Sequence, residues 1–384
     1  MHRKNRTKYL RRTAGRALVW TAAAALMTAC GGLSPVPTGQ TAAEATGVTR
    51  TYYISADKVV WNYAPQGFNV ITGQPFGDTE NVFVKQGPHR IGAQYVKCLY
   101  RGYTDARFAQ KTATEPSNGL LGPVIRAAVG DTIRVVFRNT CPFATGIHPH
   151  GVFYTKAGEG APYNDGTSGA NKADDAVPTG GTFTYQWAVP ERAGPSSMDA
   201  SSVMWMYHGH TDEVADTYAG LMGPMVVTRR GGARADGSPA DVDRELFALF
   251  MVSDENQSPF LDENIARFAQ GGGPPPGDEE GFEESNLMHS INGFVYGNGP
   301  MLTLHLGERV RWYVMGMGNE VDLHTPHWHG NTVSVGGMRM DVVSLLPAGM
   351  VTADMQPDDP GIWLFHCHVS DHILAGMQAR YQVS

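Results

Sequence analysis

The sequence predicts an all-β fold made of two β-sandwich domains. Short alternating or apolar runs, such as residues 133–137 and 310–314, are separated by turn residues, and the chain holds 46 Gly and 24 Pro. Strands with this punctuation are typical of β-sandwiches. At 384 residues with 42% apolar side chains, the chain is long enough for about two domains with substantial cores.

An internal repeat supports this organisation. A Gly-Pro pair followed at one fixed interval by a Gly-acid turn occurs within residues 122–134 and again within 299–311. Further on, residues 205–210 (Trp-Met-Tyr-His-Gly-His) parallel residues 363–368 (Trp-Leu-Phe-His-Cys-His). The chain is therefore expected to contain two copies of one domain type.

These observations set the expected boundaries. We expect a first domain at residues 51–230, a linker at 231–243 and a second domain at 244–384. Residues 271–284, with a Gly-Gly-Gly-Pro-Pro-Pro run and an acidic tail, are expected to form a surface loop.

The N-terminal segment has the pattern of an export signal. A basic region that includes Arg11-Arg12 is followed by uncharged residues 17–29, too short a stretch to span a bilayer. The surroundings of the arginine pair favour a plain basic region over a twin-arginine signal. The segment Leu-Met-Thr-Ala-Cys ending at Cys30 predicts a signal peptide at residues 1–30 with a lipoprotein cleavage box, then a tether at 31–50. The protein is then periplasmic or at the cell surface and lipid-anchored; ordinary cleavage nearby is the alternative.

The charge of the chain limits the kinds of partner. The net charge is -7, and the acidic surplus lies after the basic N-terminal region, which disfavours nucleic acid as a partner and attracts cations.

The two remaining cysteines can be linked. In an oxidising compartment Cys98 and Cys141 are candidates for a disulfide. Two buried free thiols remain the alternative, because the sequence does not give their separation.

Ten of the fourteen histidines fall in four clusters. The clusters are His148-Pro149-His150, His208-Gly209-His210, residues 324–329 (His-Thr-Pro-His-Trp-His) and residues 366–372 (His-Cys-His-Val-Ser-Asp-His). A zinc site needs only three or four ligands. Ten imidazoles with a thiolate and a thioether therefore predict several copper ions.

One segment of the last cluster can touch two metal centres. In an extended strand His366 and His368 share one face, while Cys367 projects to the other. Cys367, His372, a weak thioether such as Met377 and one further histidine form the ligand set of a blue-copper electron-transfer site. The flanking imidazoles are then free to serve a second centre.

Alignment of the two copies indicates how the sites are divided. His324, Cys367 and His372 correspond to Thr145, Gly209 and Val214 in the first copy, so the blue site is expected only in the second domain. Both copies retain four paired histidines. This even split predicts a metal cluster clamped between two domains.

These clusters resemble the multicopper oxidase family, two-domain type, and the chain from about Thr51 onward is similar to the first and last domains of ceruloplasmin joined together. Supporting stretches are residues 87–92, 120–123, 315–322 and 360–364. The resemblance implies two cupredoxin-like Greek-key β-sandwich domains. It also implies a copper-dependent oxidoreductase that takes electrons singly from a small reductant and reduces dioxygen to water.

The resemblance assigns a role to each candidate ligand. The blue copper takes His324, Cys367, His372 and Met377. The single normal copper takes His148 and His327. The coupled pair, which completes a trinuclear oxygen-reducing centre, takes His150, His208, His210, His329, His366 and His368.

The reductant implied by the resemblance is Fe(II). Asp371 beside ligand His372, with Glu284 and His289, matches the acids and the histidine of iron-oxidising members, and hard carboxylates favour Fe(III). A solvated loop for Glu284 and a hydrogen-bonded core residue for His289 are the alternatives. A two-domain laccase acting on phenols or aromatic amines is the alternative activity, and a non-catalytic copper-binding or electron-transfer protein is a third interpretation.

Two further expectations follow from the resemblance. A calcium site is implied at the backbone carbonyl of Lys156 with Asn171, Asp174 and Asp175; a solvated loop is the alternative. The six domains of ceruloplasmin predict three chains here, because a head-to-tail contact between domains can close into a ring. We therefore expect a homotrimer with its trinuclear centres between neighbouring chains.

Overall fold

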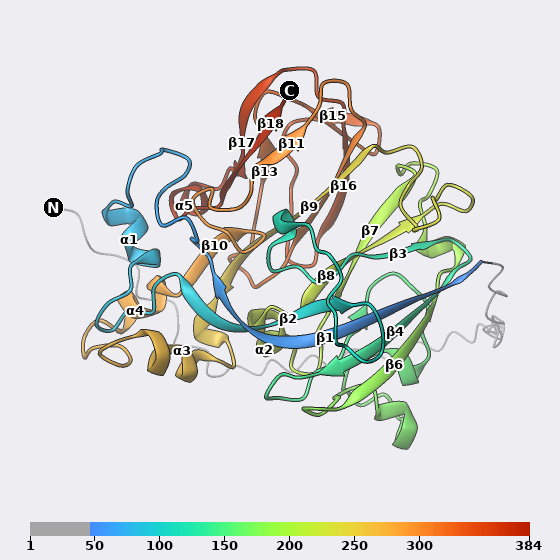
Figure 1. The fold of residues 1–384 in the computed structure, drawn as a ribbon, viewed down its shortest axis with the longest axis horizontal. Coiled ribbons are helices and arrows are strands. Elements are labelled where there is room, and N and C mark those ends of the chain that lie inside the picture. The colour runs from blue at the N-terminus through green and yellow to red at the C-terminus, as the bar shows by residue number, and fades with distance from the viewer. Residues whose placement is uncertain (1–46) are drawn as a thin grey trace, which may run out of the picture. The chain divides into compact units, whose positions relative to one another are not determined.

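The computed structural model describes residues 47–384, and these form one compact unit of two β-sandwiches (Figure 1). The expected signal peptide, Cys30 and residues 31–46 of the tether lie outside the described residues. None of the described helices is long and apolar enough to cross a membrane.

The first sandwich consists of two four-stranded sheets with strand orders β2-β1-β4-β6 and β3-β8-β7-β5. Its strands are β1 (Thr49–Asn62), β2 (Gln94–Tyr103), β3 (Ile125–Ala128), β4 (Thr132–Asn139), β5 (His148–Pro149), β6 (Thr182–Ala188), β7 (Ser202–His208) and β8 (Met222–Thr228).

The second sandwich has a six-stranded sheet, β10-β9-β12-β16-β14-β15, and a four-stranded sheet, β11-β18-β17-β13. Its strands are β9 (Arg244–Asp254), β10 (Leu287–Ile291), β11 (Leu302–Leu304), β12 (Val310–Gly316), β13 (Pro326–Trp328), β14 (Val333–Val335), β15 (Met338–Met340), β16 (Met350–Met355), β17 (Gly361–Cys367) and β18 (Gln378–Val383).

The repeat recognised in the sequence reappears in the topology. The order β3-β8-β7-β5 of the first sandwich has its counterpart in β11-β18-β17-β13 of the second, and β2-β1-β4 has its counterpart in β10-β9-β12. The expected all-β fold is confirmed. Because the same strands pair in both copies, the histidine motifs occupy equivalent positions in the two domains.

Strand β9 explains how the sandwiches share apolar surface. Its residues 246–252 are all apolar and buried on both faces. Phe247 and Leu249 belong to the core that extends from the first domain, whereas Ala248 and Phe250 belong to the core of the second. The alternation of a strand thus lets β9 serve two cores at once.

In the described part of the chain, five short α-helices lie in the connections: α1 (Asp78–Val84), α2 (Glu213–Ala219), α3 (Leu261–Phe268), α4 (Glu279–Ser285) and α5 (Ser370–Leu374). Single 3₁₀ turns occur at Pro116–Asn118, Lys156–Gly158, Gly169–Lys172, Glu191–Ala193 and Glu255–Gln257. The expectation of a loop throughout residues 271–284 is wrong for its last part, which begins α4. Glu279 and Glu280 stand in the first turn of α4, where the helix dipole favours acidic side chains.

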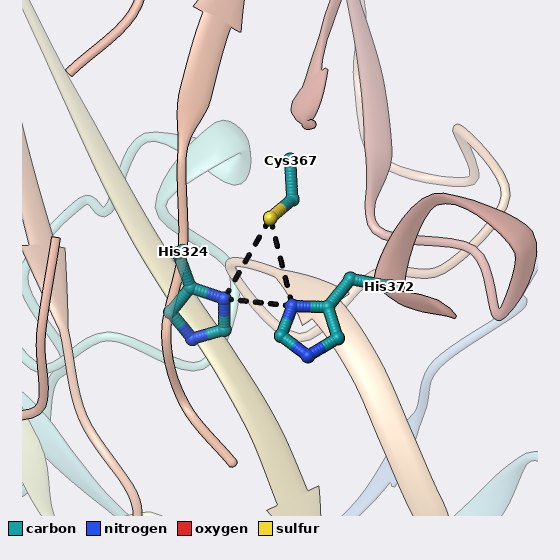
Figure 2. A group of neighbouring side chains, drawn as sticks. All are labelled: His324, Cys367 and His372. Carbon is teal, nitrogen blue, oxygen red and sulfur yellow. Dashed lines mark hydrogen bonds between the residues drawn. The ribbon is translucent and has the colours of Figure 1, made fainter. Parts of the chain in front are cut away.

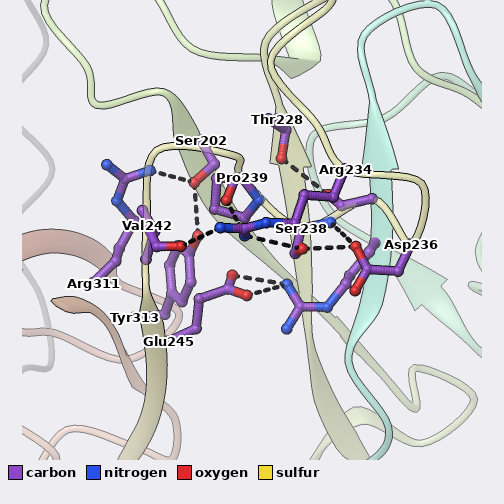
Figure 3. A network of polar contacts seen from close by, with 12 residues as sticks. Ser202, Thr228, Arg234, Asp236, Ser238, Pro239, Val242, Glu245, Arg311 and Tyr313 are labelled. Carbon is purple, nitrogen blue, oxygen red and sulfur yellow. Dashed lines mark hydrogen bonds and ion pairs between the residues drawn. The ribbon is translucent and has the colours of Figure 1, made fainter. Parts of the chain in front are cut away.

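The segment between β8 and β9 is held by polar contacts at the junction of the domains (Figure 3). The Arg234 guanidinium donates to the carbonyls of Pro239 and Val242. Across the junction, Arg311 donates to the Ser202 hydroxyl at 2.8 Å. The Arg234 contacts thus hold the segment in its own fold, and the buried contact of Arg311 joins the two sandwiches.

The two cysteines of the first domain form a disulfide. Cys98 on β2 and Cys141 after β4 are bonded, with their Cα atoms 6.1 Å apart. Both are fully buried. The disulfide interpretation of the sequence is confirmed, and Cys367 is the one free cysteine within residues 47–384.

Candidate metal centres

Two nitrogens and one sulfur converge in the second domain (Figure 2). The Sγ atom of Cys367 lies 3.5 Å from Nδ1 of His372 and 3.9 Å from Nδ1 of His324, and the two Nδ1 atoms are 3.1 Å apart. All three side chains are buried. These separations suit a single ion bound at about 2.0 to 2.3 Å from each atom.

The chemistry of this donor set suits copper. Burial acts to raise the pKa of the Cys367 thiol, but hydrogen bonds with His324 and His372 outweigh it and lower the pKa to about 6. The thiolate is the form that binds metal. Met377 is fully buried. Its backbone N–H donates to the His372 carbonyl, and its carbonyl accepts from the Cys367 N–H.

The pairing of β13 with β17 builds a second site on the other side of Cys367. His327 lies opposite His366 in the strand register. Nε2 of His366 lies 3.2 Å from Nδ1 of His327 and 3.0 Å from Nε2 of His329. The ring of His368 contacts those of His366 and His327. The alternation expected of this strand, with imidazoles on one face and the thiolate on the other, is therefore seen.

The first domain repeats this strand pairing without the cysteine. His148 lies opposite His208 in the pairing of β5 with β7. The Nε2 atoms of His150 and His208 are 3.1 Å apart, and the His210 ring lies 5.2 Å from that of His148. Gly209 stands where Cys367 stands in the second copy.

Each set of four histidines, termed a quartet, closes on itself. Within residues 47–384, ring contacts join members of the same quartet and none joins the two quartets. His208 and His366 are buried, whereas His368 is exposed. The cluster expected between two domains is thus not assembled from the two quartets of one chain.

Buried and half-buried imidazoles of the quartets are kept neutral and so can accept a metal. Burial lowers the pKa of His208 to about 3. It lowers the pKa values of His150 and His366 to about 4. Neutral imidazole is the metal-binding form. The Nδ1 atoms of His208 and His366 hydrogen-bond backbone carbonyls at 2.9 and 2.7 Å, which leaves Nε2 for a ligand.

Two of the residues expected to bind iron, His289 and Asp371, lie near the blue-copper candidate. The His289 ring is 5.3 Å from that of His372, and its Nδ1 donates to the Leu287 carbonyl. Burial lowers the pKa of His289 to about 4, and the Asp371 carboxylate opposes this effect. Asp371 and Glu284 are both exposed, on α5 and α4.

The residues expected to bind calcium are only partly gathered. Asp174 is buried; one carboxylate oxygen accepts from the Gly160 N–H and the other has no hydrogen-bond partner. Asp175 is buried and pairs with Lys172 at 3.2 Å. Asn171 is exposed, and the Lys156 side chain pairs with Glu159. The unpartnered buried oxygen of Asp174 suits a hard cation such as calcium. The Lys172 ammonium, however, competes with such a cation for the Asp175 carboxylate.

The sequence reasoning missed Asp322. It is fully buried beside His324, and its Oδ1 lies 3.1 Å from Nε2 of that ring. Burial acts to lower the pKa of His324, but the contacts with Asp322 and Cys367 outweigh it and raise the pKa of the ring above its usual value. An acid two residues before a candidate ligand was the only signal available.

Comparisons with known proteins agree with this geometry. Two sequence models of the multicopper oxidase family match residues 102–232 and 276–384. Ferroxidase HEPHL1 of Mus musculus is 45% identical over 339 residues, which cover 88% of this chain and 29% of that protein. Ceruloplasmin of Rattus norvegicus is 41% identical over 341 residues, which cover 87% of this chain and 32% of that protein.

The chain thus spans less than a third of the length of these relatives. Among solved structures, multicopper oxidase mgLAC gives a TM-score of 0.55 at 17% identity, covering 88% of this chain and 87% of that one. At that identity the likeness concerns the fold.

Proposed function

We propose that this chain, which belongs to the multicopper oxidase family, couples the one-electron oxidation of Fe(II) to the four-electron reduction of dioxygen to water. The observation that carries the proposal is the convergence of Cys367, His324 and His372 next to a quartet of imidazoles. Copper held by these residues supplies one-electron redox chemistry and the binding and reduction of dioxygen.

The chain's own residues link the two kinds of site. Cys367 projects toward His324 and His372. Its sequence neighbours His366 and His368 belong to the quartet of the second domain. A single strand thus gives a covalent connection between the site that receives electrons and the site that uses them. Hydrogen bonds from ring nitrogens to backbone carbonyls hold the imidazoles in place.

The trinuclear centre is assigned to the contact between two chains. Each quartet offers four imidazoles and is partly exposed, His368 most of all. A metal ion held by one quartet can therefore also be bound by histidines of a second protomer. Head-to-tail contacts of the first domain with the second domain of a neighbour close into a ring, and three chains reproduce six domains. A homotrimer is therefore expected; a monomeric mass with full oxygen uptake would refute it.

Iron is proposed as the reductant at Glu284, His289 and Asp371. The His289 ring against ligand His372 and the effect of Asp371 on the pKa of His289 support this choice. A relative 45% identical to this chain is a ferroxidase by name. The laccase alternative is not favoured, because none of these observations points to a phenol.

The test of the function is oxygen uptake by copper-loaded protein with Fe(II), Cu(I) and a phenol in parallel. Glu284→Ala and Asp371→Ala are expected to lower kcat/KM for Fe(II) about tenfold and to leave phenol turnover unchanged. Glu280→Ala, on the same helix, is the matched control and should match the parent. Equal losses with both substrates would remove the iron site; one copper per chain without oxygen uptake would favour the electron-transfer alternative.

Calcium and the membrane tether complete the proposal. Calcium is assigned to Asp174 and Asp175, with Asn171 and the Lys156 carbonyl completing the site. Its removal by a chelator is expected to lower the thermal stability of the parent more than that of Asp174→Asn.

Export with lipidation of Cys30 is tested by labelling with a radioactive fatty acid in cells. A Cys30→Ala variant that still incorporates label would refute the anchor.

A further inference from the structure

The Asp322 carboxylate is a buried charge aimed at a candidate copper ligand. Its side chain and that of His324 are both fully buried. Oδ1 lies 3.1 Å from Nε2 of His324 and accepts from the Val252 N–H at 2.7 Å, while Oδ2 accepts from the Asn319 N–H at 2.9 Å. Two of the three partners are backbone N–H donors, and the third is a ring nitrogen that can donate when it carries the ring proton.

The contact selects the tautomer of His324. Nδ1 is the nitrogen that faces His372 and Cys367, so it must carry no proton if it is to bind copper. The ring proton then resides on Nε2, and Asp322 accepts a hydrogen bond from this N–H group. A carboxylate in this position fixes the ring orientation and makes the imidazole a stronger donor to the metal.

The loop before His324 is shaped to hold this carboxylate. Gly318 has a φ of +122°, and a Cβ there would meet Asp322 Oδ2 at 2.0 Å, so a side chain at this position would displace the acid. Asn319 donates from its side chain to the hydroxyl of Tyr218, in the first domain. The loop is therefore anchored across the domain junction, which limits the freedom of Asp322.

The first copy of the domain provides an internal comparison. In the alignment that pairs His324 with Thr145, the position of Asp322 is occupied by Phe143, which packs against Phe260. The first copy, which lacks counterparts of Cys367, His324 and His372, thus also has no acid at the position of Asp322. The carboxylate accompanies the metal-binding residues rather than the fold.

We infer that Asp322 is a positioning residue that fixes His324 for copper and lowers the reduction potential of the blue site. Within residues 47–384, its one ion-pair partner is His324. Its negative charge, held in a low-dielectric interior, stabilises the more positive oxidised ion over the reduced one. This inference rests on the proposed blue-copper function.

The experiment compares the redox titration of copper-loaded parent, Asp322→Asn and Glu320→Gln. Asn keeps an oxygen acceptor for His324 but removes the charge, so the potential of Asp322→Asn is expected to rise by at least a tenfold shift in the Cu(II)/Cu(I) equilibrium, about 59 mV. Its affinity for Cu(II) is expected to fall about tenfold. Glu320 is exposed two residues away, and Glu320→Gln should titrate like the parent.

A second measurement covers the case in which Asp322→Asn fails to fold. In the parent loaded with diamagnetic Cu(I), nitrogen NMR is expected to show a slowly exchanging proton on Nε2 of His324. Rapid exchange there, an unchanged potential in Asp322→Asn, or an equal shift in Glu320→Gln would overturn the inference. These results leave a blue parent intact, whereas a colourless copper-loaded parent removes the proposed function together with the inference.

Discussion

Replacing Lys97 by Met tests a buried ion pair that joins the two domains. Lys97 on β2 is 1% exposed and Glu255, after β9, is fully buried. Lys97 also donates to the Tyr218 carbonyl at 2.8 Å. Removal of the ammonium would leave the Glu255 carboxylate buried without a counter-charge, and breaking such a pair costs roughly 3 to 5 kcal/mol.

The structure indicates how the variant relaxes and hence the size of the effect. Burial raises the pKa of Glu255, and Lys97 opposes that rise. Without Lys97, the folded state of lowest free energy has a protonated Glu255. Protonating a carboxyl of ordinary pKa 4.5 at pH 7 costs about 3 kcal/mol, at 1.36 kcal/mol per pH unit.

The sign of the pH dependence follows from the raised pKa. In the variant the contribution of Glu255 to stability is full below pH 4.5 and is lost as the pH rises, because the unfolded carboxyl ionises first. The deficit of Lys97→Met relative to the parent is therefore expected to shrink from about 3 kcal/mol at pH 7 to about 1 kcal/mol at pH 5.

Urea unfolding of the metal-free proteins at both pH values measures these differences. The matched control is Lys58→Met, because Lys58 pairs with Glu263 across the same two domains at 2.7 Å but both side chains are about 40% exposed. Its deficit is expected to stay below about 1 kcal/mol at either pH. A deficit of Lys97→Met that does not change with pH, or that equals the control, would refute the reasoning.

Three further outcomes are expected. Cys367→Ser abolishes the blue absorption of the copper-loaded protein and leaves the mass measured by light scattering unchanged; persistent colour would contradict the ligand assignment. Joint replacement of Cys98 and Cys141 by Ala lowers the free energy of unfolding in urea by about 4 kcal/mol, from the closure entropy of a 43-residue separation; a loss under about 1 kcal/mol would show that the unfolded chain is constrained in some other way. The metal-free protein loses stability as the pH falls below 6.5, because burial lowers the pKa of His208 to about 3 and of His366 to about 4 while unfolded histidines protonate; equal urea midpoints at pH 7 and pH 5 would contradict this.

The sequence alone determined the β architecture, the repeat and the choice of candidate metal ligands. Strand alternation has a period of two, so the order His366-Cys367-His368 already assigns the thiolate to one face and the imidazoles to the other. The ring and sulfur contacts follow that rule. Local order along the chain sufficed because the contacts depend on neighbours within one strand and its partner.

Only the tertiary structure decided contacts between segments distant in sequence. It joined Cys98 to Cys141, closed each histidine quartet separately, and brought the Val252 and Asn319 N–H groups to the carboxylate of Asp322. Residues 279–285 became a helix despite a loop-like composition. Composition and spacing report local preference, whereas burial and hydrogen-bond partners depend on how the two sandwiches pack, which the order of residues does not state.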